Sequence, residues 1–313
     1  MNYHEFKENL LERVKKDYAG ADIYIETVGK NNGTRKERLV IRGGGKRLVP
    51  CIHLNELYQC HEETEDMELC VKMIKQLAEP KGSLTLPERM WTWEECRGRI
   101  LLRLISRKWN REHLETVPHK EFLDLAVTFH LMVEKSGDMV YSMPVTNEVM
   151  NIWGTDADGL FRDGMEHLTE HSHFSVNGIY HFIARLLEGK PGAEPEKKMT
   201  DFKENKITQR LLLRNMLVLS AIPYCFGSAG MLATEFLKET AGQIGAFYIL
   251  PCSVHELILM PVSTGADAAS LKEIVRRMNR ASVNPEERLS DSIYYFNPES
   301  GEVELAEEEF HEV

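Results

Sequence analysis

Apolar positions recur along the first part of the chain with two different periods. Phe6, Leu10 and Val14 follow one another at intervals of four residues, which predicts an amphipathic helix. Between residues 22 and 53, short apolar runs are separated by turn-forming residues, as in a β-meander. A second helical period covers residues 55–79. We therefore expect a helix, a β-meander and a helix pair, in this order.

The middle of the chain combines strand patterns with helix starts. Apolar residues are nearly continuous from Phe122 to Val133, which is typical of a strand covered on both faces. Thr146 and Asp156 are residue types that cap helices, and each precedes a segment that can form a helix. These positions predict a helix over residues 147–153 and a second helix after Asp156.

A change in composition follows the middle part, because residues 189–205 are rich in proline, glycine and charged side chains. Beyond this segment, short apolar runs alternate with helical patterns up to residue 305. The predicted fold class is α+β. The predicted parts are a helix and β-meander unit (1–84), a middle α+β unit (85–188), a charged linker (189–205) and a C-terminal α+β unit (206–313).

Two segments of the predicted middle and C-terminal units resemble each other. "TVPHKEFLDLAVTF" and "ILPCSVHELILMP" each run through an apolar residue, a proline, a histidine and an acidic residue into an apolar run. The repeated order suggests a weak internal duplication of one α+β unit.

The charge of the chain limits the classes of partner that we expect. Asp and Glu number 49 against 38 Lys and Arg, which gives a formal net charge of −11. Such a surface repels polyanions, so general nucleic-acid binding is not expected. The basic residues between Arg97 and Arg111 alternate with apolar ones, and we interpret them as the solvated face of an element with one buried face.

The apolar runs and the cysteines of the chain indicate its cellular location and whether it needs a cofactor. No apolar run approaches the length of a membrane-spanning helix, and the charged first residues do not form a signal peptide. The six cysteines are scattered without a C-x-x-C pair, which fits reduced thiols. We expect a cytoplasmic protein without a membrane partner, and we predict no cofactor.

The segment His167-Leu168-Thr169-Glu170-His171 has the H-x-x-E-H spacing of one class of zinc proteases. Histidines four residues apart share a helix face and could hold one Zn²⁺, with Glu170 activating a bound water. A catalytic zinc also needs a third protein ligand and apolar surroundings. We therefore interpret the segment as a solvent-exposed helix end, and a zinc-dependent peptidase remains a minor alternative.

Ser253, His255 and Glu256 bring a hydroxyl, an imidazole and a carboxylate close together in the sequence. Neighbouring residues of a strand point to opposite faces, however, so closeness in sequence does not make a catalytic pair. We favour structural roles in a turn. His119 and Asp124 could likewise have a structural or a catalytic role. We favour a structural polar pair over an acid–base couple.

Long segments of the chain also resemble a known family. They are "VPHKEFLDLAVTFH", "FYILPCSVHELILMP" and "LKEIVRRMNRASVNPEERLSDSIYYFNPESG". They are similar to a bacterial family that is catalogued as a domain of unknown function, family 5688. The resemblance implies a soluble, intracellular α+β protein without a known activity. It also implies that the H-x-x-E-H spacing is peculiar to this chain and that serine is usual at Cys252.

The resemblance implies that some residues of this chain follow the family pattern. They are Pro118, His119, Asp124, Pro251, Ser253, His255, Glu256, Leu289, Ser290, Asp291 and Tyr294. The expected function is a non-catalytic binding or regulatory module whose partner is a protein or a small-molecule ligand. The alternative is a hydrolase-like enzyme that uses His255 and Glu256 with His119 and Asp124. This alternative requires the two histidines, or one of them with an acidic partner, to meet in a shared cleft.

Overall fold

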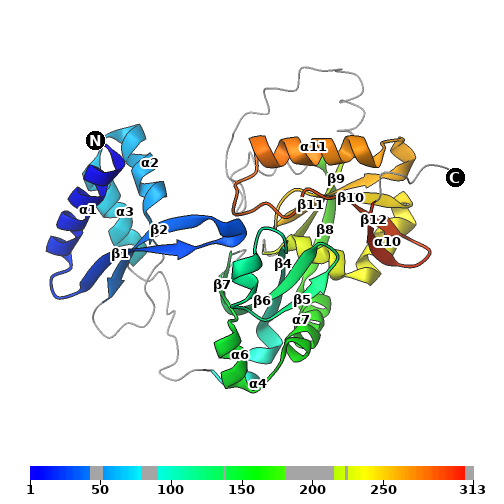
Figure 1. Ribbon diagram of the computed structural model, residues 1–313, viewed down its shortest axis with the longest axis horizontal. Helices are drawn as coiled ribbons and strands as arrows, with labels where there is room; N and C mark the ends of the chain where they lie inside the picture. Colours follow the sequence, from blue (N-terminus) through cyan, green and yellow to red (C-terminus); the bar gives the residue numbers. More distant parts are fainter. Residues whose placement is uncertain (43–51, 79–90, 137–138, 181–214, 223–224, 307–313) are drawn as a thin grey trace. The chain divides into compact units, whose positions relative to one another are not determined.

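The computed structural model describes residues 1–42, 52–78, 91–136, 139–180, 215–222 and 225–306 of the chain. The predicted linker 189–205 lies outside the described residues. The chain divides into two compact units, Met1–Met90 and Trp91–Val313. We describe each unit by itself (Figure 1).

The first unit begins with the predicted amphipathic helix. Asn2 caps it, because its side chain accepts a hydrogen bond from the Glu5 backbone and the Glu5 carboxylate accepts one from the Asn2 backbone, both at 3.0 Å. Phe6, Leu10 and Val14 are fully buried, so the predicted face is the buried one. The elements are α1 (Tyr3–Asp17), β1 (Asp22–Gly29), η1 (Asn31–Gly33), β2 (Arg35–Arg42), β3 (Ile52–His53), α2 (Leu54–Thr64) and α3 (Met67–Ala78).

The three strands of the first unit form one antiparallel sheet in the order β1-β2-β3. This is the order of a meander, as the alternating pattern predicted. The buried side chains of α1, α2 and α3 pack with those of the sheet in one core. The helix, β-meander and helix-pair order of the first unit is confirmed.

The second unit contains a four-stranded antiparallel sheet with the path β4-β6-β5, in which β7 also pairs with β6. Thr146 and Asp156 accept hydrogen bonds from the backbones of Val149 and Gly159, so both predicted helix caps are confirmed. The elements are α4 (Trp93–Cys96), η2 (Arg97–Arg99), β4 (Ile100–Ser106), α5 (Arg111–Leu114), β5 (His119–Phe122), β6 (Leu125–Ser136), β7 (Met139–Pro144), α6 (Asn147–Trp153) and α7 (Ala157–His171).

The predicted strand covered on both faces is confirmed as β6, in which residues 125–129 are all buried, but the predicted segment starts too early and takes in the end of β5. The two strands form a hairpin, because the chain reverses at Leu123 and Asp124 between β5 and β6. On one face, Ile100, Leu102 and Leu104 of β4 are buried in the core against α7. A Cβ on Gly164 of α7 would lie 2.3 Å from Leu102 Cδ2, so glycine allows this helix to approach the sheet closely.

A six-stranded antiparallel sheet follows, in the order β13-β12-β10-β11-β9-β8. Strand β8 is a new finding, since the sequence predicted no strand after the histidine-rich helix. In Figure 1, α11 lies along this sheet. The elements are β8 (His173–Gly178), β9 (Leu217–Ile222), η3 (Gly227–Leu232), α10 (Thr234–Ile244), β10 (Phe247–Pro251), β11 (Glu256–Pro261), η4 (Val262–Thr264), α11 (Ala268–Ala281), β12 (Tyr294–Asn297) and β13 (Glu302–Leu305).

One hydrophobic core joins the two sheets of the second unit. Phe129 of β6, Leu219 of β9 and Phe247 of β10 belong to the same cluster of buried side chains. The described residues on either side of the predicted linker therefore share a core. The two similar Pro–His segments hold different places, because Pro118 precedes β5 whereas Pro251 ends β10.

The α+β fold class is confirmed by the mixture of helices with antiparallel sheets in both units. Within the described part of the chain, every helix falls short of the length and apolar character that crossing a membrane requires.

Candidate functional site

The four-stranded sheet carries polar side chains on the face opposite to the core. Arg103 of β4 and His119 of β5 both pair with Thr128 of β6, so the three side chains lie in one row on the same face. His130 lies two residues beyond Thr128 and shares this face. Arg103, His119 and His130 are half-buried, while Thr128 is buried. An arginine and two histidines therefore line one side of this sheet.

A close backbone contact in the second unit places an aromatic ring next to these side chains. A Cβ on Gly227 would lie 2.1 Å from the carbonyl oxygen of His255, so only glycine fits at this point. The Ser228 hydroxyl donates to the carbonyl oxygen of Val254 at 2.8 Å and ties the loop to the same turn. Phe226, just before this contact, has a left-handed backbone with φ of 51°. Left-handed backbone is uncommon for a bulky residue and occurs at sites where the surrounding contacts enforce it.

Phe226 touches three polar side chains. Its ring centroid lies 4.8 Å from that of His130, edge to face, and 6.0 Å from that of His255 in a stacked arrangement. The guanidinium carbon of Arg103 lies 5.2 Å from the Phe226 ring centroid. We call Arg103, His130, Phe226 and His255 the Arg103 recess.

The charge of Arg103 is not neutralised by a direct contact in this recess. Its Nε is buried and has no hydrogen-bond partner among the described residues. Burial lowers the pKa of Arg103, and the more distant charges of Glu286 and Glu287 act in the opposite direction. Within the described residues, no carboxylate forms an ion pair with this guanidinium.

The two histidines of the recess are neutral at pH 7. Burial, together with the positive charge of Arg103, lowers the pKa of His255 to about 4. The same two causes, burial first, hold the pKa of His130 well below its usual value. The Ser142 hydroxyl lies 3.4 Å from Nδ1 of His130. The recess therefore presents one half-buried cation and two neutral imidazoles.

The predicted turn role of Ser253 is confirmed by its contacts. Its hydroxyl donates to the Glu256 carboxylate at 2.5 Å and accepts from the backbone N–H groups of His255 and Glu256. Burial raises the pKa of Glu256, which this hydrogen bond opposes. In the described part of the chain, the His255 ring has no carboxylate partner. Glu256 thus holds the turn rather than the imidazole.

Asp124 lies at a second place, in the turn between β5 and β6. Its carboxylate accepts hydrogen bonds from the hydroxyls of Ser290 at 2.7 Å, Ser292 at 2.9 Å and Tyr294 at 2.7 Å. Burial, with the charge of Asp124, raises the pKa of Tyr294 well above its usual value. Asp124 therefore fixes the hairpin to the C-terminal corner of the unit.

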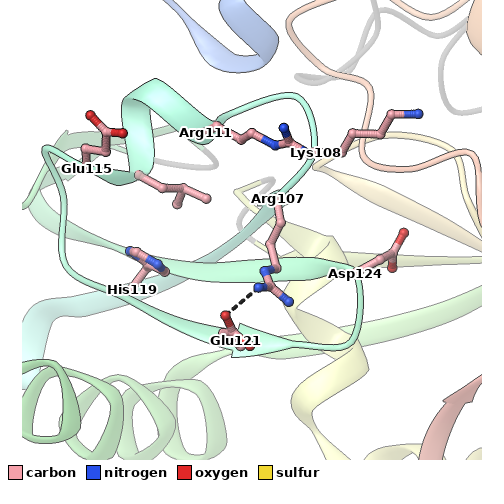
Figure 2. Close-up of a pocket in the computed structure, with 8 residues that line it drawn as sticks. Arg107, Lys108, Arg111, Glu115, His119, Glu121 and Asp124 are labelled. Atoms are coloured by element: carbon pink, nitrogen blue, oxygen red, sulfur yellow. Dashed lines mark hydrogen bonds and ion pairs between the residues drawn. The ribbon is translucent and has the colours of Figure 1, made fainter.

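His119 and Asp124 line an open cavity of about 490 Å³ (Figure 2). In Figure 2, Arg107 points toward Glu121, with which it forms an ion pair, while Lys108 and Arg111 lie above it. Nδ1 of His119 lies 3.2 Å from the carbonyl oxygen of Val117. Among the described residues, no hydrogen bond joins His119 to Asp124, so the predicted polar pair does not form.

The candidates of the hydrolase alternative do not meet in this cavity. Ser253, His255 and Glu256 are absent from the described residues that line it. His119 lines the cavity of Figure 2, whereas His255 contacts Phe226 in the Arg103 recess.

The H-x-x-E-H segment forms the end of α7, as predicted, but His167 is not exposed to solvent. It is 8% exposed, and its Nδ1 lies 2.9 Å from the carbonyl oxygen of Gly98. The rings of His167 and His171 lie 5.0 Å apart, while Glu170 and His171 are 59% exposed. No group of three or more His, Cys, Asp and Glu side chains in the described residues is arranged to hold a metal ion.

Cys225, which precedes Phe226, and Cys252 carry protonated thiols. Burial raises the pKa of Cys225 to about 12 and that of Cys252 to about 12. Neither thiol is therefore poised as a nucleophile at neutral pH.

Sequence reasoning missed three of the four recess residues. Arg103 was assigned to a solvated face, which is wrong, since its Nε is buried. Lys108, from the same basic stretch, is exposed as predicted. His130 and Phe226 stood within apolar runs and gave no signal of their own. Their convergence depends on the loop contact at Gly227, which a linear pattern does not reveal.

Fold and site together define an α+β protein with a half-buried arginine between an aromatic ring and two neutral histidines. The chain belongs to the family of unknown function (DUF5688), whose profile matches residues 3–298. The family resemblance seen in the sequence is thereby confirmed. Neither the curated proteins nor the solved structures gave a match to this chain.

Proposed function

We propose that this protein is a non-catalytic binding module that holds a small anionic ligand in the Arg103 recess. The observation that carries the proposal is the buried Nε of Arg103, which has no partner among the described residues. Burying a cation without a counter-charge costs free energy, which a bound anion recovers through charge-assisted hydrogen bonds. An anion should therefore bind the recess more tightly than a neutral ligand.

The neighbours of Arg103 favour a small ligand with oxygen acceptors. A guanidinium presents its N–H groups in a planar fork that matches a carboxylate or a phosphate. His130 and His255 are neutral, and each can donate one further hydrogen bond. Phe226, 9% exposed, supplies an apolar wall between them. We propose that Arg103, His130 and His255 donate hydrogen bonds to a carboxylate or phosphate group of the ligand.

The same contacts favour binding over hydrolysis. A histidine base needs a partner to orient it, and the two carboxylates of the hydrolase alternative are engaged by hydroxyl groups. We also infer that the protein acts in the cytoplasm of a bacterium, because the family resemblance and the free cysteines fit a reducing compartment.

The proposal is tested with a thermal-shift screen of acetate, succinate, phosphate and sulfate at matched ionic strength. A ligand at 100 times its Kd adds about 2.7 kcal/mol to the stability of the folded state, or roughly 5 to 10 °C in Tm. We expect at least one of these anions to raise the Tm of the wild type. Arg103→Met should remove this response, since it removes the buried charge and retains an apolar side chain.

Arg162→Met is the matched control, because Arg162 is 74% exposed and lies 3.8 Å from Asp163. It should respond to the anion like the wild type. An equal response in Arg103→Met would overturn the assignment to the recess. Hydrolysis of an ester panel that disappears in His255→Asn would overturn the non-catalytic part of the proposal.

A further inference from the structure

A second pocket, of about 310 Å³, lies between α11 and the loop that follows β4. Its lining includes Trp109 from this loop, Asn279 from α11 and three arginines. None of the four recess residues is among the described side chains that line it. The volume is at the lower end of the range for small-molecule sites. The pocket is therefore large enough for a compact ligand, and its lining is distinct from the Arg103 recess.

Asn279, which lines this pocket, has an unused hydrogen-bond acceptor. The residue is 3% exposed, and its Nδ2 donates to the carbonyl oxygen of Ser290 at 2.9 Å and to Asp291 Oδ1 at 2.7 Å. These two acceptors fix the orientation of the amide. Its Oδ1 is buried without a partner among the described residues. A buried acceptor without a donor is costly, so a ligand that brings an N–H group would satisfy it.

Three arginines and two carboxylates, Glu273 and Asp291, line the pocket, so its formal charge is positive although the chain as a whole carries a formal net charge of −11. Arg276 and Arg280 are four residues apart on α11 and so share one face of the helix. Arg280 lies 3.4 Å from Glu273, whereas Arg276 has no ion pair within the described part of the chain. Arg288 enters from the loop before β12. Guanidinium groups in this arrangement suit a phosphate.

Trp109 adds an aromatic surface to the same pocket. Its indole is half-buried and belongs to the lining. Planar rings stack on exposed indole faces, and nucleic-acid bases do so irrespective of their sequence. Asp291, beside Asn279, repels a phosphate and favours a group rich in hydrogen-bond donors. The pocket thus offers contacts for a donor-bearing ring as well as guanidinium groups for an anion.

We propose that this pocket binds a mononucleotide. The base lies against Trp109 and donates an N–H to Asn279 Oδ1, and the phosphate contacts Arg276 and Arg288. This assignment differs from general nucleic-acid binding, because a pocket of this volume holds one nucleotide rather than a strand.

The test is isothermal titration calorimetry of the intact chain with AMP, CMP, GMP and UMP. The corresponding nucleosides and inorganic phosphate are titrated in parallel. We expect at least one mononucleotide to bind, and its nucleoside and phosphate alone to bind at least about tenfold more weakly, since each makes only part of the contacts. No binding by any of the four mononucleotides, or equal binding by phosphate alone, would overturn the proposal.

Matched variants assign the binding to the pocket. Arg276→Ala should raise the Kd of the nucleotide at least about tenfold. Arg277 is next on the same helix and pairs with Glu273, and Arg277→Ala should change this Kd less than about twofold. Trp109→Phe should retain binding and lose the quenching of tryptophan fluorescence by the nucleotide. Arg103→Met should bind the nucleotide like the wild type, because the recess is a separate site. Equal losses in the Arg276 and Arg277 variants would contradict the assignment.

Discussion

At the scale of single residues, Asp124 shows how one carboxylate can hold a turn in place. The preceding residue, Leu123, has a φ of 55°, a backbone conformation that most side chains disfavour. Three hydroxyls donate to the Asp124 carboxylate, and the Tyr294 side chain among them is fully buried. These hydrogen bonds hold the strained turn in place.

Asp124→Ala should therefore reduce the free energy of unfolding by about 3 kcal/mol, because it leaves buried hydroxyls without an acceptor. Urea unfolding monitored by circular dichroism measures this loss. Asp158→Ala is the control, since Asp158 is 75% exposed and pairs with Lys120 at the surface, where such pairs contribute little. A loss in Asp124→Ala no larger than in the control would show that the three hydrogen bonds do not stabilise the fold.

At the scale of elements, the loop entering η3 builds the Arg103 recess. It begins with Phe226 in a left-handed conformation and passes His255 at a contact that leaves no room for a Cβ on Gly227. Phe226 reaches Arg103, His130 and His255 only because the loop comes this close. The recess thus depends on one glycine.

Gly227→Ala should lower the stability by about 2 kcal/mol or more, since the new Cβ displaces backbone rather than the end of a side chain. It should also abolish the response to anions. Gly242→Ala in α10 is the matched control, because its Cβ meets nothing within 4 Å. Alanine in place of a helical glycine should raise the stability by about 1 kcal/mol. An anion response in Gly227→Ala equal to that of the control would contradict the role of the loop.

The elements also show how much the sequence could predict. Helix positions and caps depend on neighbours within a few residues, so Thr146, Asp156 and the Ser253 turn could be predicted from local chemistry. The hydrogen bond from Ser290 to Asp124 spans 166 positions in the sequence. No local pattern specifies such a contact, and the same is true of Phe226 meeting Arg103.

At the scale of the whole molecule, the two sides of the predicted linker act as one body because their buried side chains share a core. The core explains why the recess draws Arg103 and His130 from one sheet and His255 from the turn between two strands of the other. The net charge of the chain was a poor guide to the charge of a local site. A formal net charge of −11 coexists with an arginine without an ion pair among the described residues.

The central claim, that the Arg103 recess binds an anion, predicts a link between binding and protonation. His255 has a folded-state pKa of about 4, below its unfolded value of about 6.5. Neutral His255 therefore stabilises the fold above pH 6.5, and this contribution is lost as the pH falls toward 4. A bound anion favours the protonated ring, so it raises the pKa, and binding strengthens as the pH falls.

NMR titration of the His130 and His255 imidazoles, in chloride and in the anion selected by thermal shift, measures this link most directly. The account predicts that in chloride the pKa of His255 is about 4 and that of His130 lies well below its usual value, and that at least one of the two rises by roughly one pH unit or more with the anion. In Arg103→Met, both pKa values should rise in chloride and no longer respond to the anion. Identical wild-type titration curves in chloride and in the anion would contradict the account.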